Sequence, residues 1–160
     1  MKKSIINREV GKDSKLFEGA AVNQLTHSAG VSIEHDGLRH IYASGKTATF
    51  DQSDDPADWD TIVGPGDIFE QTRQVCRNIQ TTVEAAGATL NDIVRVRVYV
   101  TQPMAPADFH KIHEARAEFF ESAHYPASTL IVVHALARAD ALIEIDADAV
   151  IPVTPTGGSS

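Results

Sequence analysis

The sequence predicts a single α+β domain in which two helices cover one face of a sheet. Its 160 residues suit one domain, since domains typically run to about 100–150 residues. Runs with β-type alternation occur early and late in the chain, and the two segments with helical periodicity are separated by one more alternating run. The resulting order, β-β-α-β-α-β-β, is typical of two helices packed on one sheet.

Five segments have the pattern of strands, and they are residues 25–33, 38–43, 93–100, 128–134 and 141–151. His35-Asp36-Gly37 favours a hairpin between the first two. A short turn favours a second antiparallel hairpin between the last two. Alternation in the third segment places Val94, Val96, Val98 and Val100 on one face.

Two segments have the pattern of helices. The first begins after Asp67, a good N-cap with Glu70 three residues later, and Gly87 can end it. Its predicted buried residues recur at helical spacing: Ile68, Val75, Ile79, Val83 and Ala86. The second covers residues 106–121, with an apolar stripe formed by Phe109, Ile112, Phe119 and Phe120.

The sheet face away from the helices mixes apolar and ionisable side chains. We expect it to carry Arg97, Tyr99, Ser128, Leu130, Val132, His134 and Glu144. Leu142 and Val150 follow the phase of Glu144 in the last strand. Such a face is too apolar to be left in water and too polar for a simple core, so it predicts a subunit interface that contains a polar pocket.

Composition excludes several classes of protein. A net charge of −8 argues against a nucleic-acid binder, which needs a basic surface. Cys76 is the single cysteine, so no intrachain disulfide forms. No apolar run is long enough for a membrane span and no secretory signal is evident, so we expect a cytoplasmic protein. Residues 1–20 are interpreted as a lead-in, residues 21–152 as the domain and residues 153–160 as a flexible tail.

An ordered set of segments resembles the RidA/YjgF family of reactive-intermediate (imine/enamine) deaminases. The set spans roughly residues 25–151. It consists of Tyr42–Gly45, Asp67–Arg73, Asn78–Gly87, Asp92–Val100, Asp108–Phe109, Glu118–Phe120, Tyr125–Ala127 and Ile143–Ile145. The resemblance implies a chorismate-mutase-like homotrimer that binds a small molecule in pockets between its subunits, with no cofactor.

The resemblance also assigns roles to individual residues. Glu144 matches the glutamate thought to hold the hydrolytic water, and Ser44 and Gly45 match the family's pocket. His113 stands where the family has an asparagine, and His27 corresponds to a tyrosine near the first strand. Leu130 replaces a cysteine that is often found in the penultimate strand.

One departure concerns substrate binding. Deaminating members have an arginine that clamps the substrate carboxylate at the position of Ser128. A hydroxyl cannot replace the bidentate contact of a guanidinium. Either the substrate lacks that carboxylate, or another cation holds it. Arg97 on the open face and Arg116 within the apolar stripe of the second helix are the candidates.

Each candidate also has a purely structural interpretation. Glu144 could belong to a solvated strand face beside Asp146 and Asp148, and Arg116 to a buried ion pair. His113 could be a packed histidine or an acid/base near neutral pH. His110 and His113 share a helix face but lack further ligands, so we expect no metal.

The leading hypothesis is therefore a hydrolytic deaminase acting on a small imine or enamine, similar to aminomuconate deaminases, with Glu144 and His113 as catalytic residues. One alternative is a non-catalytic trimer that binds a metabolite or a partner protein, favoured by the missing arginine. Another is a repurposed pocket in which His113 acts as the acid/base for a different reaction.

Overall fold

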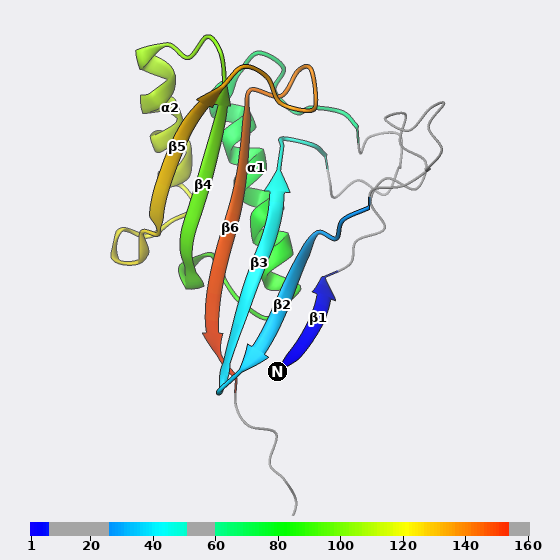
Figure 1. Cartoon of the computed structure of the whole chain (residues 1–160). Helices are drawn as coiled ribbons and strands as arrows, with labels where there is room; N and C mark the ends of the chain where they lie inside the picture. Colours follow the sequence, from blue (N-terminus) through cyan, green and yellow to red (C-terminus); the bar gives the residue numbers. More distant parts are fainter. Residues whose placement is uncertain (7–25, 51–59, 154–160) are drawn as a thin grey trace, which may run out of the picture.

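Two helices pack on one face of a six-stranded mixed sheet in the computed structural model, which describes residues 1–6, 26–50 and 60–153 (Figure 1). The strands are β1 (Lys2–Ile6), β2 (Gly30–His35), β3 (Leu38–Lys46), β4 (Ile93–Thr101), β5 (Ala127–Val133) and β6 (Ile143–Pro152). The helices are α1 (Ile68–Glu84) and α2 (Pro106–Ala117). The predicted α+β fold, with both helices on one side of a mixed sheet, is confirmed.

The sheet order is β1-β2-β3-β6-β4-β5, so β6 lies in the middle of the sheet although the other five strands precede it in sequence. It pairs antiparallel with both β3 and β4. Strand β5 pairs parallel with β4, and α2 is the crossover between them. The predicted hairpin between the last two strands is therefore wrong, because β4 separates β5 from β6.

Helix α1 begins and ends where the sequence predicts. The side chain of Asp67 accepts hydrogen bonds from the backbone N–H groups of Phe69 and Glu70 at 2.9 and 3.3 Å. After the helix, Gly87 has a φ of +84° and its N–H donates to the carbonyl of Glu84. Glycine adopts this left-handed conformation without steric cost, which lets the chain turn back toward β4.

The core lies between the sheet and the helices. Alternate residues of β6, Ile143, Ile145, Ala147 and Ala149, are all buried, as predicted. In β4 the regular alternation starts at Val96, two residues later than expected. The pairing with β6 shifts between Ile93 and Arg95, so Ile93 is buried and Val94 is 51% exposed. The bulge turns Val94 away from the core, and apolar–polar alternation in the sequence does not reveal where a bulge occurs.

Strand β1 is a second correction. Residues 1–20 were expected to be a lead-in, yet Lys2–Ile6 pairs antiparallel with β2 along its whole length and forms an edge of the sheet. The pairing gives the backbone of this segment its hydrogen bonds, and five residues without apolar–polar alternation do not predict such pairing. Residues 7–20 and 154–160 of the expected terminal segments lie outside the described residues, as does residue 25 of the strand predicted over residues 25–33. Residues 26–29 of that prediction are not in a strand, because β2 begins at Gly30.

The phase of β5 is a third correction. Its residues pair in parallel with β4 as Val96 with Ser128 and Val98 with Leu130. Val96 and Val98 are buried under the helices, so Ser128, Leu130 and Val132 lie on the helix side of the sheet. Their neighbours Thr129, Ile131 and Val133 share the open face with Glu144 instead. Helix α2 is also shorter than predicted, since it ends at Ala117.

Candidate functional site

Glu144 lies on the open face of the sheet, opposite Tyr99 of β4. On its other side, the pairing of β6 with β3 is interrupted between Ala43 and Lys46. Gly45 sits in this irregularity, and a Cβ at that position would come within 1.9 Å of Oε1 of Glu144. The glutamate carboxylate therefore occupies the space that a side chain at position 45 would fill.

Ser44 anchors the segment that precedes β2. Its N–H donates to the carbonyl of Ala29 at 3.0 Å, and its hydroxyl donates to the carbonyl of Ser28 at 2.8 Å. These two bonds fix the backbone next to the exposed His27, which lies close enough to Glu144 to interact electrostatically with its carboxyl group. Ser44, Gly45, His27, Tyr99 and Glu144 form what we call the Glu144 cluster.

The carboxyl group of Glu144 is half-buried and has an environment that disfavours its charge. Burial is the main factor that raises its pKa above the ordinary value, and the neighbouring Asp146 adds to the effect. Within the described part of the chain, the carboxylate accepts no hydrogen bond and forms no ion pair. Its oxygens are free to accept hydrogen bonds from a ligand or a water molecule.

Two buried amide side chains of α1 fix the walls of this cluster. Gln71 accepts a hydrogen bond from the N–H of Leu142 at 2.8 Å and donates to the carbonyl of Asp140 at 2.9 Å, which positions the start of β6. Asn78 donates to the carbonyls of Thr47 and Thr49, directly after β3. Sequence reasoning missed both residues, although a polar amide on the apolar face of a helix is a signal for such a role.

Arg97 also lies on the open face, but its charge is already balanced. It contacts Asp146 Oδ1 at 2.8 Å and Asp148 Oδ2 at 2.8 Å, so the two carboxylates raise its pKa. The hydroxyl of Tyr99 donates to the other oxygen of Asp146 at 3.3 Å. A guanidinium held by two carboxylates is poorly suited to bind the anion of a substrate.

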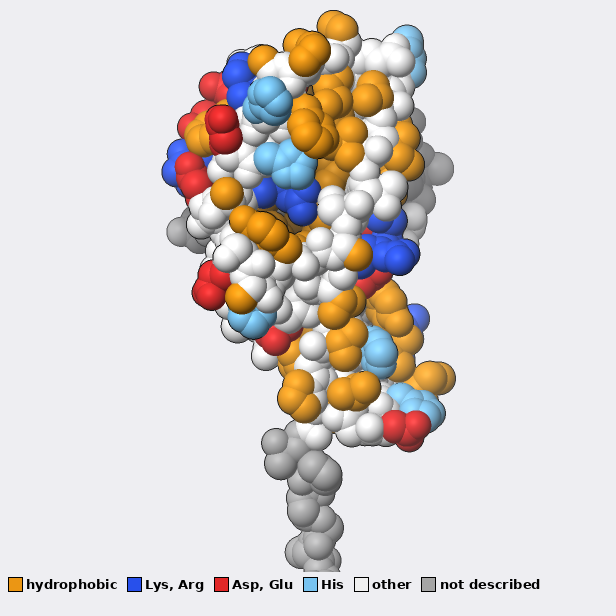
Figure 2. Space-filling view, turned by 90° about the vertical axis from the view of Figure 1, so that its left-hand side faces the viewer, with side chains coloured by type: hydrophobic (Ala, Val, Ile, Leu, Met, Phe, Trp, Pro, Cys, Tyr) orange, Lys and Arg blue, Asp and Glu red, His pale blue; other side chains and the backbone are white. Residues whose placement is uncertain are grey.

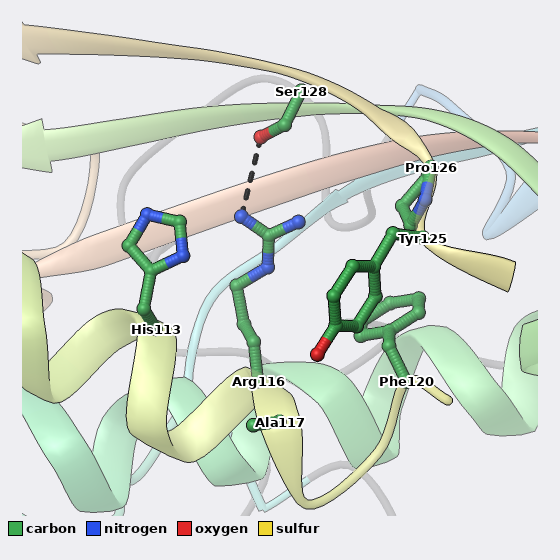
Figure 3. Close-up of a pocket in the computed structure, with 7 residues that line it drawn as sticks. All are labelled: His113, Arg116, Ala117, Phe120, Tyr125, Pro126 and Ser128. Carbon is green, nitrogen blue, oxygen red and sulfur yellow. Dashed lines mark hydrogen bonds between the residues drawn. The ribbon is translucent and has the colours of Figure 1, made fainter. Parts of the chain in front are cut away.

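Arg116, in contrast, lines a cavity of about 250 Å³ between α2 and β5. The lining residues, shown in Figure 3, are His113, Arg116, Ala117, Phe120, Tyr125, Pro126 and Ser128. Nη1 of Arg116 donates to the hydroxyl of Ser128 at 3.2 Å. The guanidinium also lies 5.7 Å from the centre of the Phe120 ring. We call this the Arg116 cavity. Sequence reasoning did not propose four of its lining residues for the site: Ala117, Phe120, Tyr125 and Pro126.

His113 projects from α2 beside Arg116 (Figure 3). Its ring contacts that of Phe109, with the centroids 4.5 Å apart. Burial is the main factor that lowers the pKa of His113, and the positive charge of Arg116 contributes. A pKa below the ordinary value of 6.5 leaves the imidazole neutral at pH 7, so it can accept a proton or a hydrogen bond.

The expected site residues thus form two groups within one chain. The Glu144 cluster and Arg97 lie on the open face, whereas the Arg116 cavity lies at the edge formed by α2 and β5. Figure 2 views the molecule from this edge and shows histidine and basic side chains beside a broad group of hydrophobic ones. Leu130 packs partly against the core, and His134 is exposed just beyond β5.

Other expected features can be placed briefly. Cys76 is buried, and burial raises the pKa of its thiol to about 12, which disfavours the reactive thiolate at neutral pH. In residues 1–6, 26–50 and 60–153, no three His, Cys, Asp or Glu side chains gather to hold a metal ion. No helix in these same ranges is long and apolar enough to cross a membrane.

Comparisons with known proteins agree with this architecture. Residues 21–151 match the family model described as endoribonuclease L-PSP. A RutC family protein of Pyrococcus horikoshii is 45% identical over 82 residues, which cover 51% of this chain and 61% of that protein. TdcF of Escherichia coli K12, provisionally assigned as a reactive intermediate deaminase, is 34% identical over 88 residues, which cover 54% of this chain and 65% of TdcF. These matches span less than two thirds of each relative.

A solved structure extends the likeness to the whole fold. The protein YyfA of Yersinia pestis, a member of the conserved Rid protein family, has a TM-score of 0.68 and 26% sequence identity. The alignment covers 94% of this chain and 100% of YyfA. The chain therefore belongs to the YjgF/RidA family, as its sequence segments indicate. The family includes proteins assigned as reactive intermediate deaminases.

Proposed function

We propose that the protein is a hydrolytic deaminase that acts on a small imine or enamine. The observation that carries this proposal is the carboxylate of Glu144, which is half-buried against Gly45 and has no hydrogen-bond partner among the residues described. A carboxylate in this environment is a stronger base than one in water. It can hold a water molecule and accept its proton.

The reaction follows from these properties. Glu144 accepts a proton from the bound water as the water oxygen attacks the carbon of the C=N bond. The nitrogen is protonated, the tetrahedral intermediate collapses, and ammonia leaves as the C=O bond forms. An imine and water thus give a carbonyl compound and ammonia, and no oxidant or cofactor is needed. An enamine enters the same sequence after its carbon is protonated to give the imine.

We place this reaction between the subunits of a homotrimer. The open face exposes large apolar side chains around its polar centre, including Ile5, Tyr42 and Ile131, which are 59%, 45% and 49% exposed. An apolar surface of this kind favours contact with another subunit. If the open face of one protomer meets the α2–β5 edge of the next, a Glu144 cluster and an Arg116 cavity share one site.

His113 supports a second candidate function. It lies in the same cavity as Arg116, within one chain, and its lowered pKa makes it a neutral base at pH 7. A pocket that uses His113 rather than Glu144 could catalyse a different proton transfer on an anionic substrate. The non-catalytic alternative is a trimer that only binds a metabolite or a partner protein. In that case neither Glu144 nor His113 contributes to a reaction rate.

Glu144→Gln separates these possibilities. The test measures ammonia release from small imines that an amino acid oxidase generates in situ, with wild type, Glu144→Gln, His113→Asn and Glu84→Gln compared. A general base contributes about 10²- to 10⁴-fold, so Glu144→Gln should lose that much activity. Glu84→Gln removes an exposed charge from α1 and should have no effect.

An unchanged rate in Glu144→Gln would end the proposal. Activity lost only in His113→Asn would support the second candidate. No ammonia release by the wild-type protein from any imine tested, with ligand binding intact, would support the binding protein.

A further inference from the structure

Arg116 has an environment that is unusual for a buried arginine. It is only 9% exposed, and arginine is rarely buried without a carboxylate partner. Arg73, Arg97 and Arg138 each contact at least one carboxylate. Arg116 forms no ion pair with any residue of the described ranges. Its side-chain hydrogen bond to the described part of the chain goes to a neutral hydroxyl, that of Ser128.

The groups around the guanidinium supply no negative charge near neutral pH. His113 is neutral or positive, and Phe120, Ala117 and Pro126 are apolar. Burial is the main factor that lowers the pKa of Arg116, and Cys76 and Tyr125 oppose this effect. Because the ordinary pKa of arginine is far above 7, the side chain stays charged. The cavity therefore holds one uncompensated positive charge.

We infer that Arg116 is the anchor of an anion-binding subsite, and that this subsite takes the carboxylate of a small ligand with a flat, apolar body. As a statement about a substrate, this inference rests on the proposed function. The binding itself requires no catalysis.

The charge of the ligand follows from the charge of the cavity. One guanidinium balances one negative charge, and its planar N–H groups match the two oxygens of a carboxylate. A phosphate dianion would leave a second charge without a partner in a partly dehydrated site, which is unfavourable. Ser128 holds Nη1 on the β5 side of the cavity (Figure 3), which leaves the remaining N–H groups for the ligand.

The shape of the ligand follows from the walls. The rings of Phe120 and Tyr125 lie on the same side of the guanidinium, next to Pro126 (Figure 3). Aromatic rings favour stacking with flat groups. The cavity volume of about 250 Å³ is below the range of about 300–1,000 Å³ typical of pockets for drug-sized ligands. A conjugated or aromatic acid of modest size fits these conditions.

Four probes test the inference by calorimetric or NMR titration of the wild-type protein. Benzoate has the charge and the flat body, benzamide has the same shape without charge, acetate has the charge without the body, and phenyl phosphate has a second charge. We expect benzoate to bind about 10- to 100-fold more tightly than benzamide, the range for a hydrogen-bonded ion pair. We also expect it to bind more tightly than acetate and phenyl phosphate.

Four variants assign the effect to Arg116. Arg116→Gln should remove the preference for benzoate over benzamide. Arg77→Gln, which removes a positive charge from α1 outside the cavity, should retain it. Arg116→Lys keeps the charge but loses the planar fork, so it should keep only part of the preference. In the double variant Arg116→Gln/Ser128→Arg, a guanidinium enters the same cavity from β5 and should restore tight binding.

The outcomes are distinct. Equal affinities for benzoate and benzamide in the wild-type protein would overturn the inference without any variant, as would a preference retained in Arg116→Gln. If phenyl phosphate bound more tightly than benzoate, the ligand would not be a monoanion. If acetate bound as tightly as benzoate, the ligand would not need a flat, apolar body. A wild-type protein that prefers benzoate but releases no ammonia from imines would overturn the deaminase proposal alone, so its failure and the failure of this inference are distinguishable.

Discussion

Oε1 of Glu144 lies where the Cβ of any residue other than glycine at position 45 would be, since that atom would approach to 1.9 Å. The two residues come from strands that are far apart in sequence, and the irregular pairing of β3 with β6 brings them together. The carboxylate thereby occupies the space that a side chain at position 45 would fill, and it has no hydrogen bond to the described residues. This relationship makes Gly45 a positioning residue for Glu144.

Gly45→Ala should move the carboxylate while leaving the fold intact. Adding a methyl group to a packed site costs about 1–3 kcal/mol, and rotation of Glu144 away from the added methyl group limits this cost. Displacement of a catalytic group by about 1 Å can lower a rate by about 100-fold. The measurement is kcat on an identified imine beside the melting temperature. A variant with wild-type kcat would show that the position of Glu144 does not matter for the rate.

Glu144→Gln should stabilise the protein at pH 7. The pKa of Glu144 is raised above its ordinary value near 4.5, so between these two values the folded state binds more protons than the unfolded state. Stability therefore falls as pH rises through this window. Glutamine has no charge to bury, so the variant avoids this loss of stability. The difference in melting temperature between the variant and the wild type should vanish as the pH falls below 4.5. A melting temperature lowered at pH 7 would instead indicate a structural glutamate.

Arg97→Gln should destabilise the open face. It leaves Asp146 and Asp148, two residues apart on β6, without their shared cation. Because the groups are partly exposed, we expect a loss of about 1 kcal/mol, near the upper end for surface ion pairs. Urea unfolding of Arg97→Gln, Asp148→Asn and the double variant measures the coupling. Additive effects would show that Arg97 and Asp148 do not stabilise one another.

Asn78→Ala should destabilise the protein more strongly. Asn78 is buried, donates to the carbonyls of Thr47 and Thr49 and accepts from the amide of Gln74, so its removal breaks three hydrogen bonds at a cost of about 1–3 kcal/mol. Gln80→Ala on the solvent side of α1 is the control and should change the free energy of unfolding by less than about 0.5 kcal/mol. Equal effects of both substitutions would contradict the assigned role of Asn78.

The proposed trimer predicts a particle with three times the 17.3 kDa mass of the chain. Ile131→Glu places a charge on the open face and should yield monomers in light scattering at micromolar concentration. Gln80→Glu adds the same charge on the solvent side of α1, outside both proposed contact surfaces, and should leave the mass unchanged. A wild-type mass of 17.3 kDa would exclude the trimer and the shared site.

Local signals in the sequence predicted the positions of the helices and which side chains of β6 face the core. Asp67 caps α1 because its side chain bonds two residues nearby in sequence, and the alternation of β6 separates apolar from acidic residues. Strand β5 has no such contrast, since residues 130–133 are all apolar. Its phase depends on the pairing of Val98 with Leu130, a contact that no local pattern encodes.

The candidate site was predictable to a similar extent. Family resemblance indicated Glu144 and Gly45, and the missing arginine made Arg116 a candidate, but sequence could not distinguish Arg116 from Arg97. That distinction depends on the two aspartates that contact Arg97, which are about fifty residues away in sequence. Partners at such separations are set by the strand order, which places β6 beside β4.

The central place of β6 has a consequence for synthesis of the chain on the ribosome. Strands β1–β3 and strands β4–β5 contact each other in the sheet only through β6, and all five emerge before it. A nascent chain that stops short of residue 143 holds two separate half-sheets with unpaired edges, which are prone to aggregate. Gly45 and Tyr99 become neighbours of one carboxylate only when β6 inserts between these halves. The step that completes the sheet therefore also assembles the Glu144 cluster.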